Sequence, residues 1–259
     1  MDPATQPVIE VQDLDLGYEG HSVLSHISFS VNKGDIFIVM GVSGCGKSTL
    51  LKSMIGLKEP SGGKVLFYSK SFWDEDEIGQ KNMMRGFGIL YQAGALWSSL
   101  TVGENVALPL QLYTKLSTEQ IREIVALKLS LVGLEGHEDL FPSEISGGMC
   151  KRVSLARAIA LDPGIIFFDE PSAGLDPINA RKLDDLILEL RDGLGATIVI
   201  VTHELASIFA IGNNSVFLDE TSKTMIATGD PKALLADSKD PRVIQFLTRG
   251  SLKDEQKSQ

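Results

Sequence analysis

Apolar and polar positions along this chain follow two different periods. Continuous apolar runs of strand length have the composition of parallel strands buried on both faces: DIFIVM at 35–40, GIIFFD at 164–169 and ATIVIV at 196–201. Other segments repeat their apolar residues with helical spacing: residues 47–55, 118–131, 147–161 and 177–195. This alternation of strand and helix predicts an α/β fold with a parallel core sheet.

The first part of the chain has a different pattern, in which apolar and polar residues alternate. Residues 8–18 and 25–35 alternate in the manner of antiparallel strands with one exposed face. A helical stretch interrupts the later parallel pattern, and we expect it to form a helical subdomain at about 102–160. We interpret residues 1–249 as a single domain and the polar residues 250–259 as a disordered tail.

Composition and charge narrow the choice of partners. The chain has 259 residues, of which 43% are hydrophobic, and its formal net charge is −10. Proteins that bind the phosphate backbone of nucleic acids usually present a basic face, so nucleic acid is not expected as a partner. Cys45 and Cys150 lack the spacing of a metal site and are interpreted as packing residues. We find no signal peptide and no apolar run long enough to span a membrane, which indicates a cytosolic chain.

The segment GVSGCGKST directly follows the first apolar run. Its spacing G-x-x-x-x-G-K-S is that of a phosphate-binding loop, whose glycines let backbone N–H groups turn toward a phosphate. The lysine can reach the terminal phosphates, the serine hydroxyl can bind Mg²⁺, and the following helix directs its positive dipole end to the anion. A plain turn would explain one glycine but not this spacing. The residues expected to bind the nucleotide are Gly41, Val42, Ser43, Gly44, Cys45, Gly46, Lys47, Ser48 and Thr49.

Two carboxylates follow the second apolar run. Asp169 and Glu170 come at the carboxyl edge of the expected sheet, where the ligands of parallel sheets bind. Asp169 can share Mg²⁺ with Ser48, and Glu170 can polarise an attacking water. Alone, the sequence DEP could equally end a strand in a solvated turn. The phosphate-binding loop favours the catalytic interpretation, because the two sets of ligands are complementary.

A second glycine-rich helix start occurs in SEISGGMCKR. Ser146, Gly147 and Gly148 would leave bare N–H groups at a helix N-terminus, which is again an anion site. One phosphate-binding loop does not need a second such site within its own subunit. We therefore expect a dimer in which this segment closes on the nucleotide of the other subunit. The simpler alternative is that these residues form only an N-cap.

Together these segments resemble the ATP-binding subunits of ABC transporters over essentially the whole chain, with the family's landmarks in the family's order. By this resemblance Tyr18 stacks on adenine, Gln92 contacts Mg²⁺ and water, and His203 contacts the γ-phosphate. Asp176, in SAGLD, contacts the opposite subunit. The implied fold is a P-loop NTPase of the ABC type, with a β-rich N-terminal subdomain, a parallel-sheet RecA-like core and a helical subdomain that carries the signature.

Each of these four residues also has an ordinary structural interpretation. Tyr18 could be a strand aromatic, and Gln92 could be a solvated loop residue. His203 could cap the helix that follows it, and Asp176 could be the N-cap of the helix beginning at Pro177. The resemblance to the family rests on the ordered set of motifs rather than on any one of these four residues.

One departure from the family pattern narrows the resemblance further. The commonest signature ends in Gln, whereas Met149 stands at that position here. With methionine at this position, the signature resembles that of the ATPases of Mla-type phospholipid transport systems, which work with Mce-domain proteins. The segments YQAGALWSSLTVGENVALPL, FPSEISGGMCKR and DPRVIQFL also resemble that group. Some members of this group have a longer C-terminal tail that wraps around the other subunit. We make no prediction of such a contact for this chain.

The resemblance implies ATP hydrolysis by in-line attack of water on the γ-phosphate. Lys47, Mg²⁺ and His203 would stabilise the transferring group, with Glu170 orienting the water and Gln92 sensing both metal and water. The implied Mg²⁺ ligands are Ser48, Gln92 and Asp169.

The implied partners are a second copy of the chain, an integral membrane permease docked near residues 92–106, a Mce-domain lipid-binding protein and small accessory subunits. The implied location is the cytoplasmic face of the inner membrane.

Other functions are compatible with the same motifs. The main rival is the ATPase of a small-solute importer, because cargo residues lie in the permease rather than in this chain. A soluble ABC ATPase of cofactor assembly is a further alternative. ABC ATPases of DNA repair insert long coiled coils or zinc modules, and this chain has only a short helical insert.

Overall fold

The computed structural model describes residues 7–249 and divides into two compact units. The first unit is built from the chain up to Gln80 and from Val199 onward, and the second is Lys81–Ile198. The tail expected at 250–259 lies outside the described residues. The interpretation of 1–249 as a single domain stays a prediction.

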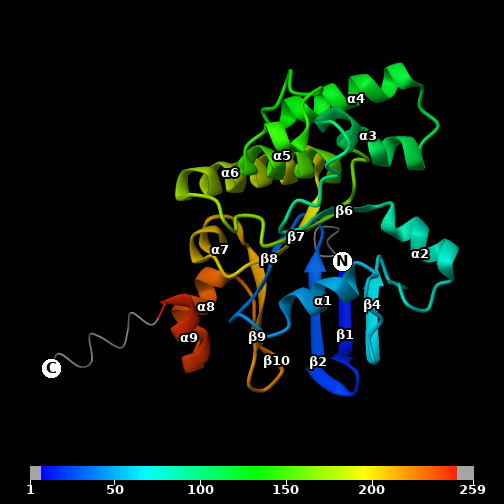
Figure 1. Ribbon diagram of the computed structural model, residues 1–259. Coiled ribbons are helices and arrows are strands. Elements are labelled where there is room, and N and C mark those ends of the chain that lie inside the picture. Colours follow the sequence, from blue (N-terminus) through cyan, green and yellow to red (C-terminus); the bar gives the residue numbers. More distant parts are fainter. Residues whose placement is uncertain (1–6, 250–259) are drawn as a thin grey trace. The chain divides into compact units, whose positions relative to one another are not determined.

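An antiparallel sheet in the first unit has the strand order β2-β1-β4-β5, and Figure 1 labels its first three strands side by side. Its strands are β1 (Pro7–Tyr18), β2 (His21–Asn32), β4 (Gly62–Phe67) and β5 (Lys70–Ser71). β1 and β2 form a hairpin in which Val11 lies opposite Phe29 and Tyr18 opposite His21. The inward residues of β1 are buried, including Ile9, Val11, Leu14 and Leu16. The antiparallel strands expected from the alternating pattern are therefore confirmed.

The first unit also contains parallel strands. β3 (Ile36–Gly41) pairs in parallel with β9 (Asn214–Asp219), and β10 (Thr224–Thr228) pairs antiparallel with β9. β8 (Thr197–Val201) begins in the second unit and ends in the first, where the Thr202 N–H donates to the Val39 carbonyl at 3.2 Å. Every residue of β3 and β8 is buried, which explains their continuous apolar sequences.

Short helices complete the first unit. They are α1 (Lys47–Met54), α7 (Leu205–Ile211), α8 (Pro231–Asp237) and α9 (Pro241–Leu247). α8 and α9 each begin with an aspartate N-cap, Asp230 or Asp240, followed by proline at the first helical position. The two helices contact each other near the end of the described chain (Figure 1).

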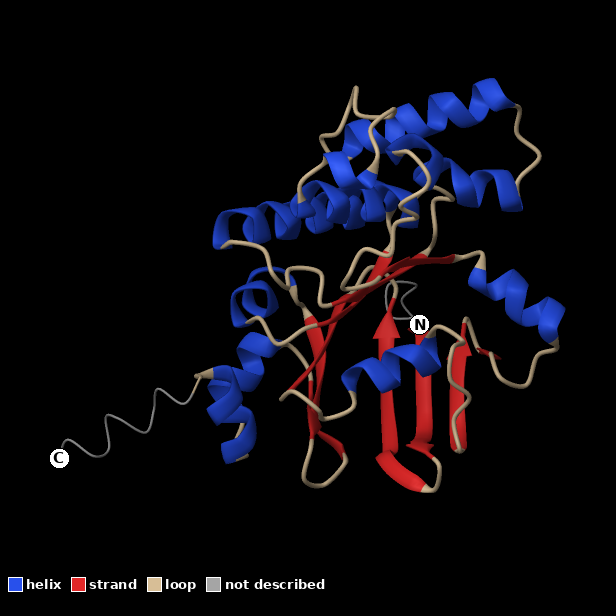
Figure 2. Ribbon diagram, in the orientation of Figure 1, coloured by secondary structure: helices blue, strands red, loops and turns tan. Residues whose placement is uncertain are grey.

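The second unit contains two parallel strands and a group of helices (Figure 2). β6 (Phe87–Leu90) pairs with β7 (Ile165–Asp169). Its helices are α3 (Val102–Tyr113), α4 (Thr118–Leu131), α5 (Gly147–Ala158) and α6 (Pro177–Leu194), and α2 (Glu77–Met84) spans the boundary between the units. α3 and α4 start at capping boxes on Thr101 and Ser117. Contacts among α3, α4 and α5 make this group compact.

The expected α/β fold is confirmed, and the strand and helix segments singled out by the pattern form as expected. The pattern did not single out β4, β5, β6, β9 or β10, or the helices α2, α8 and α9. β9 was missed because its apolar core is only VFL, between polar residues. No helix in residues 7–249 has the length and apolar character needed to cross a membrane.

Candidate functional site

The nucleotide loop expected from GVSGCGKST joins β3 to α1 in the first unit. Its glycines take backbone conformations that other residues rarely adopt, with φ of 151° at Gly41, 87° at Gly44 and 103° at Gly46. These positive φ values turn successive peptide groups and create the concave arrangement of N–H groups that binds anions. Gly46 is the N-cap of α1, and the first turn of that helix contains no acidic residue to oppose an anion.

Close neighbours also require glycine at two of these positions. A Cβ atom on Gly41 would lie 2.4 Å from the Leu218 carbonyl oxygen of β9, and one on Gly46 would lie 2.8 Å from the Leu24 side chain. Any larger residue would push the loop away from the strands that support it. The glycines of the G-x-x-x-x-G-K-S motif are thus required both by their backbone conformation and by the close neighbours of Gly41 and Gly46.

Lys47 lies inside the loop rather than in solvent. Its side chain is buried, and Nζ donates hydrogen bonds to the carbonyls of Gly41 at 2.9 Å and Val42 at 3.0 Å. The ammonium group is therefore held within the concave side of the loop. Ser48, the next residue, is exposed at the start of α1, and Thr49 is half-buried.

Cys45 is buried within the same loop. Burial raises the pKa of its thiol, and the nearby Lys47 opposes that shift only in part. The neutral thiol is a poor nucleophile and a poor metal ligand. This agrees with its interpretation as a packing residue.

Tyr18 and His203 are the other expected site residues of the first unit. Tyr18 ends β1 with 47% of its surface exposed, and the Lys58 ammonium lies 3.9 Å from the centre of its ring. His203 follows β8, and its Nε2 lies 3.8 Å from a carboxylate oxygen of Glu204. The N-cap of α7 is Glu204, so the alternative in which His203 caps that helix is wrong.

Asp169 and Glu170 follow one another at the carboxyl end of β7 in the second unit. Asp169 is half-buried, while Glu170 is only 9% exposed. Glu170 has a φ of 48°, in the left-handed region that side chains other than glycine rarely occupy. Such strain persists only where the surroundings fix it, and it is common at functional sites.

Ser146, Gly147, Gly148 and Asp176 line one cavity of about 570 Å³ in the second unit. Ser146 is the N-cap of α5 and accepts a hydrogen bond from the Met149 N–H at 3.3 Å. Asp176 is the N-cap of α6 and accepts from the N–H groups of Ile178 and Asn179, both at 3.0 Å. The N-cap alternatives for both segments are therefore correct as local structure. Gly147 and Gly148 border the same cavity, so these caps also form part of a concave surface.

Lys151 was missed by sequence reasoning, although it lies next to the signature residues. Its Nζ donates to the carbonyl oxygens of Pro171, at 2.8 Å, and Ala173. Burial lowers the pKa of its ammonium group, and the negative charge of Glu170 opposes that shift. No sequence spacing signals this contact, because its acceptors are backbone carbonyls.

Gln92 begins the segment expected to meet a permease, residues 92–106. Gln92 is exposed, and the backbone just after it is fixed by Arg157, which donates to the carbonyls of Gly94 and Ala95, both at 2.9 Å. Farther along, the fully buried Asn105 bonds both the N–H and the carbonyl of Trp97, at 2.9 and 3.1 Å. These bonds hold the loop in one shape.

The expected Mg²⁺ donors are a hydroxyl, an amide and a carboxylate, which are oxygen ligands of the kind this ion prefers. In the described part of the chain, no cluster of three or more His, Cys, Asp or Glu side chains could hold a metal by itself. An Mg²⁺ ion bound through substrate phosphates usually takes one or two protein carboxylates. Asp169 is the one carboxylate among the expected donors Ser48, Asp169 and Gln92, and this donor set stays a prediction.

The nucleotide loop, Tyr18 and His203 belong to the first unit, and the remaining expected site residues belong to the second. Within each unit the structure brings the expected residues to loops at strand ends and helix starts. These are the positions at which α/β proteins bind ligands.

Comparisons with known proteins give consistent results. The sequence profile described as "ABC transporter" matches residues 24–173. The intermembrane phospholipid transport system ATP-binding protein MlaF of Escherichia coli K12 is 38% identical over 95% of this chain and 91% of that protein. A probable ribonucleotide transport ATP-binding protein, mkl of Mycobacterium leprae, is 39% identical over 92% of this chain and 68% of that protein.

Solved structures resemble most of the chain as well. The structure of cbiO1 from Clostridium perfringens, part of the ABC transporter complex cbiONQ, has a TM-score of 0.82 at 30% identity. It covers 96% of this chain and 99% of its own. A dimeric ATP-binding cassette in a post-hydrolysis state, bound to ADP and Pi, has a TM-score of 0.78 at 28% identity over 86% of this chain and 98% of its own.

Proposed function

The chain belongs to the ABC transporter family, and on that premise we propose that it is the ATP-hydrolysing subunit that drives phospholipid transport through a membrane permease. The observation that carries the proposal is the 38% identity to MlaF over 95% of the chain. The glycine conformations of the nucleotide loop and the buried Lys47 support ATP as the substrate.

The chemistry assigned to the site follows from the residues in each unit. Lys47 would neutralise the terminal phosphates, since its ammonium already lies within the concave loop. Ser48, Asp169 and Gln92 would hold Mg²⁺, which supplies positive charge to the transferring phosphoryl group. Glu170 would orient and deprotonate the attacking water, and His203 would donate a hydrogen bond to the γ-phosphate.

A head-to-tail homodimer is part of the proposal. Ser146, Gly147, Gly148 and Asp176 line one cavity of this chain. The glycine-rich start of α5 suits an anion, whereas the first N–H groups of α6 already bond the Asp176 carboxylate. In the dimer this surface would close on the nucleotide bound by the other subunit, and Tyr18 would stack on the adenine ring. ATP would then belong to the dimer interface, and hydrolysis would loosen that interface.

The permease would dock on residues 92–106, at the cytoplasmic face of the inner membrane. Support comes from the fixed shape of this loop and from Trp97, which is 59% exposed although it is a large apolar residue. A Mce-domain lipid-binding protein and small accessory subunits would complete the assembly. We treat residues 1–249 as one functional ABC ATPase domain.

The names of the relatives point to two different transported molecules. MlaF is named for phospholipid transport, whereas mkl is named for ribonucleotide transport. The segments ISGGMCKR and DPRVIQFL resemble the Mla group, and on that ground we favour lipid. A small-solute importer remains the alternative.

Calorimetry with MgATP tests the nucleotide part of the proposal. The wild-type chain should bind MgATP, and Lys47→Ala should bind it far more weakly because the triphosphate loses its buried countercharge. Turnover of the variant should fall by about 10²–10³-fold. If Lys47→Ala bound MgATP with wild-type affinity, residues 41–49 would not be the nucleotide-binding loop.

A further inference from the structure

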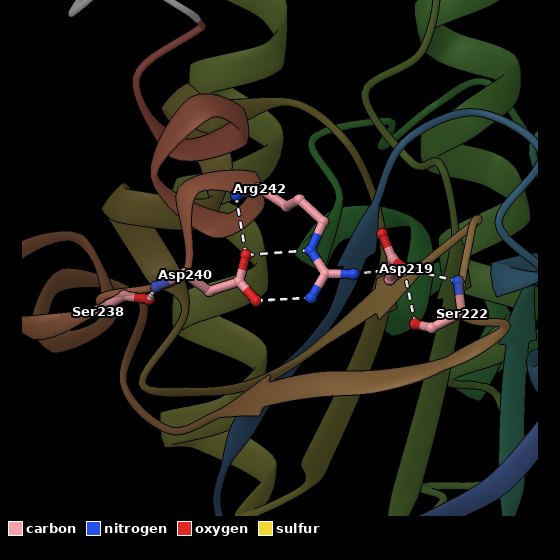
Figure 3. Close-up of polar contacts among 5 residues, drawn as sticks. All are labelled: Asp219, Ser222, Ser238, Asp240 and Arg242. Atoms are coloured by element: carbon pink, nitrogen blue, oxygen red, sulfur yellow. Dashed lines mark hydrogen bonds and ion pairs between the residues drawn. The ribbon is translucent and has the colours of Figure 1, made fainter.

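A network of ion pairs and hydrogen bonds links the start of α9 to the end of β9 (Figure 3). Arg242 uses all three guanidinium nitrogens in it. Nη1 donates to Asp219 at 2.8 Å, while Nε and Nη2 donate to the two carboxylate oxygens of Asp240 at 3.0 and 2.7 Å. Charge-assisted contacts of this bidentate kind are the strong ones among protein hydrogen bonds.

The two aspartates are fixed by further bonds. Asp219 accepts from the N–H and hydroxyl of Ser222 at 2.7 and 2.6 Å, and its side chain is only 9% exposed. Asp240 caps α9 through the Arg242 N–H at 2.9 Å. Hydrogen bonds with Arg242 hold the pKa of Asp240 at about 2, so this carboxylate is charged at neutral pH. An arginine between two charged carboxylates therefore joins two loops.

Apolar contacts strengthen the same junction. The ring of Phe246 in α9 lies 5.1 Å from the ring of Phe217 in β9, in an edge-to-face arrangement. Val243 and Leu247 are buried on the inner side of α9. α9 thus contacts β9 through Phe246 as well as through Arg242.

The β9 end that Arg242 holds is also the support of the nucleotide loop. Leu218, one residue before Asp219, pairs with Gly41, and its carbonyl leaves no room for a Cβ there. Glu220, one residue after Asp219, has a carboxylate oxygen 3.6 Å from the position of a Cβ on Gly44. Residues 218–220 therefore lie directly against the loop that would cradle the phosphates.

A second arginine ties the end of α9 to the loop of His203. Arg249 Nη2 lies 3.6 Å from a carboxylate oxygen of Glu204, the neighbour of His203. One cavity of about 540 Å³ is lined by residues of all these elements, including Val42, Ser43, His203, Arg242 and Arg249. The loops assigned to the phosphates and the α9 arginines thus share one surface within the first unit.

We propose that Arg242 is a positioning residue of the nucleotide site, which acts by holding the β9 end against Gly41 and Gly44. It does not touch the nucleotide in this scheme. The inference rests on the proposed function and deepens it, because it makes the DPRVIQFL segment part of the machinery that sets nucleotide affinity. A purely structural role, in which Arg242 only anchors α9, is the competing account.

Affinity and stability of the full-length chain separate the two accounts. Arg242→Gln and Asp219→Asn should each weaken MgATP binding by about five- to tenfold, and the double variant should be no worse than either single one. Arg242→Lys, which keeps one charged donor, should recover part of the affinity. In steady-state assays the loss should raise KM with little change in kcat.

Arg181→Gln is the matched control, because it removes an exposed ion pair with Asp185 in α6. It should leave affinity and KM unchanged. If Arg242→Gln lowers the melting temperature but keeps wild-type MgATP affinity, Arg242 merely anchors α9 and the inference is wrong. If Arg242→Gln does not fold, the same comparison is made with Asp219→Asn and Arg242→Lys. A wild-type chain that binds no MgATP would instead overturn the proposed function.

Discussion

The ammonium nitrogen of Lys151 lies 2.8 Å from the carbonyl oxygen of Pro171, so helix α5 is joined to the segment that follows Glu170. The same nitrogen also bonds the carbonyl of Ala173. One side chain therefore connects the SGGM segment with the strained turn that carries the proposed catalytic carboxylate. This connection lies wholly within the second unit.

Replacing Lys151 by methionine should lower both stability and ATPase activity. The change keeps the apolar stem but leaves two carbonyls without their donor, which should cost about 1–3 kcal/mol in the free energy of unfolding. Urea denaturation and steady-state ATPase assays measure the two effects. Lys115→Met is the control, since Lys115 is exposed in the same unit and does not line this cavity. Equal effects of the two substitutions would contradict the role given to Lys151.

Glu170→Gln should bind MgATP with an affinity within about twofold of wild type but hydrolyse it very slowly. The nucleotide loop is untouched by this change, whereas the attacking water loses its carboxylate. The variant should accumulate as an ATP-bound dimer, which size-exclusion chromatography with light scattering detects. Near wild-type turnover in Glu170→Gln would show that another group activates the water.

The signature should act on the nucleotide of the other subunit. A mixed dimer with Lys47→Ala in one subunit and Ser146→Arg in the other keeps one undamaged composite site, whereas a homodimer of either variant keeps none. Activity of the mixed dimer should therefore exceed that of both homodimers. If the signature served its own subunit, every site in the mixed dimer would be damaged, and no such excess would be seen.

The segment of residues 92–106, a loop followed by the start of α3, should be required for permease binding. Trp97→Glu places a charge on its exposed apolar side chain and should dissociate or uncouple the complex in native mass spectrometry. MgATP binding by the isolated chain should stay unchanged. Leu57→Glu is the control, because Leu57 is 58% exposed but lies outside this loop. Intact, fully coupled complexes of Trp97→Glu would reject this docking surface.

The parts that sequence predicts well are those whose information is local. Each of these motifs lies within one short segment: the glycine spacing of residues 41–49, and the carboxylates at the end of β7. The structure has both at the expected strand–loop junctions. The N-caps at Ser146 and Asp176 were likewise foreseen, as alternatives, from the residues around them.

The parts that sequence missed depend on contacts between distant residues. Lys151 and Pro171 are 20 positions apart, and Arg242 and Asp219 are 23 apart. Neither pair has a spacing that indicates contact, because a long side chain can meet any backbone or carboxylate that the fold brings to it. The left-handed conformation of Glu170 was also unforeseen, since glutamate rarely adopts it.

The central claim is that ATP hydrolysis by this chain moves phospholipid through a permease. The most direct test measures transfer of labelled phospholipid by the complex of this chain with its permease in proteoliposomes, with Glu170→Gln as the inactive control. Wild type should give MgATP-dependent lipid transfer, and its ATPase should respond to lipid composition more than to water-soluble solutes. Full ATPase activity that is independent of lipid and stimulated by a soluble solute, with no lipid transfer, would contradict the account.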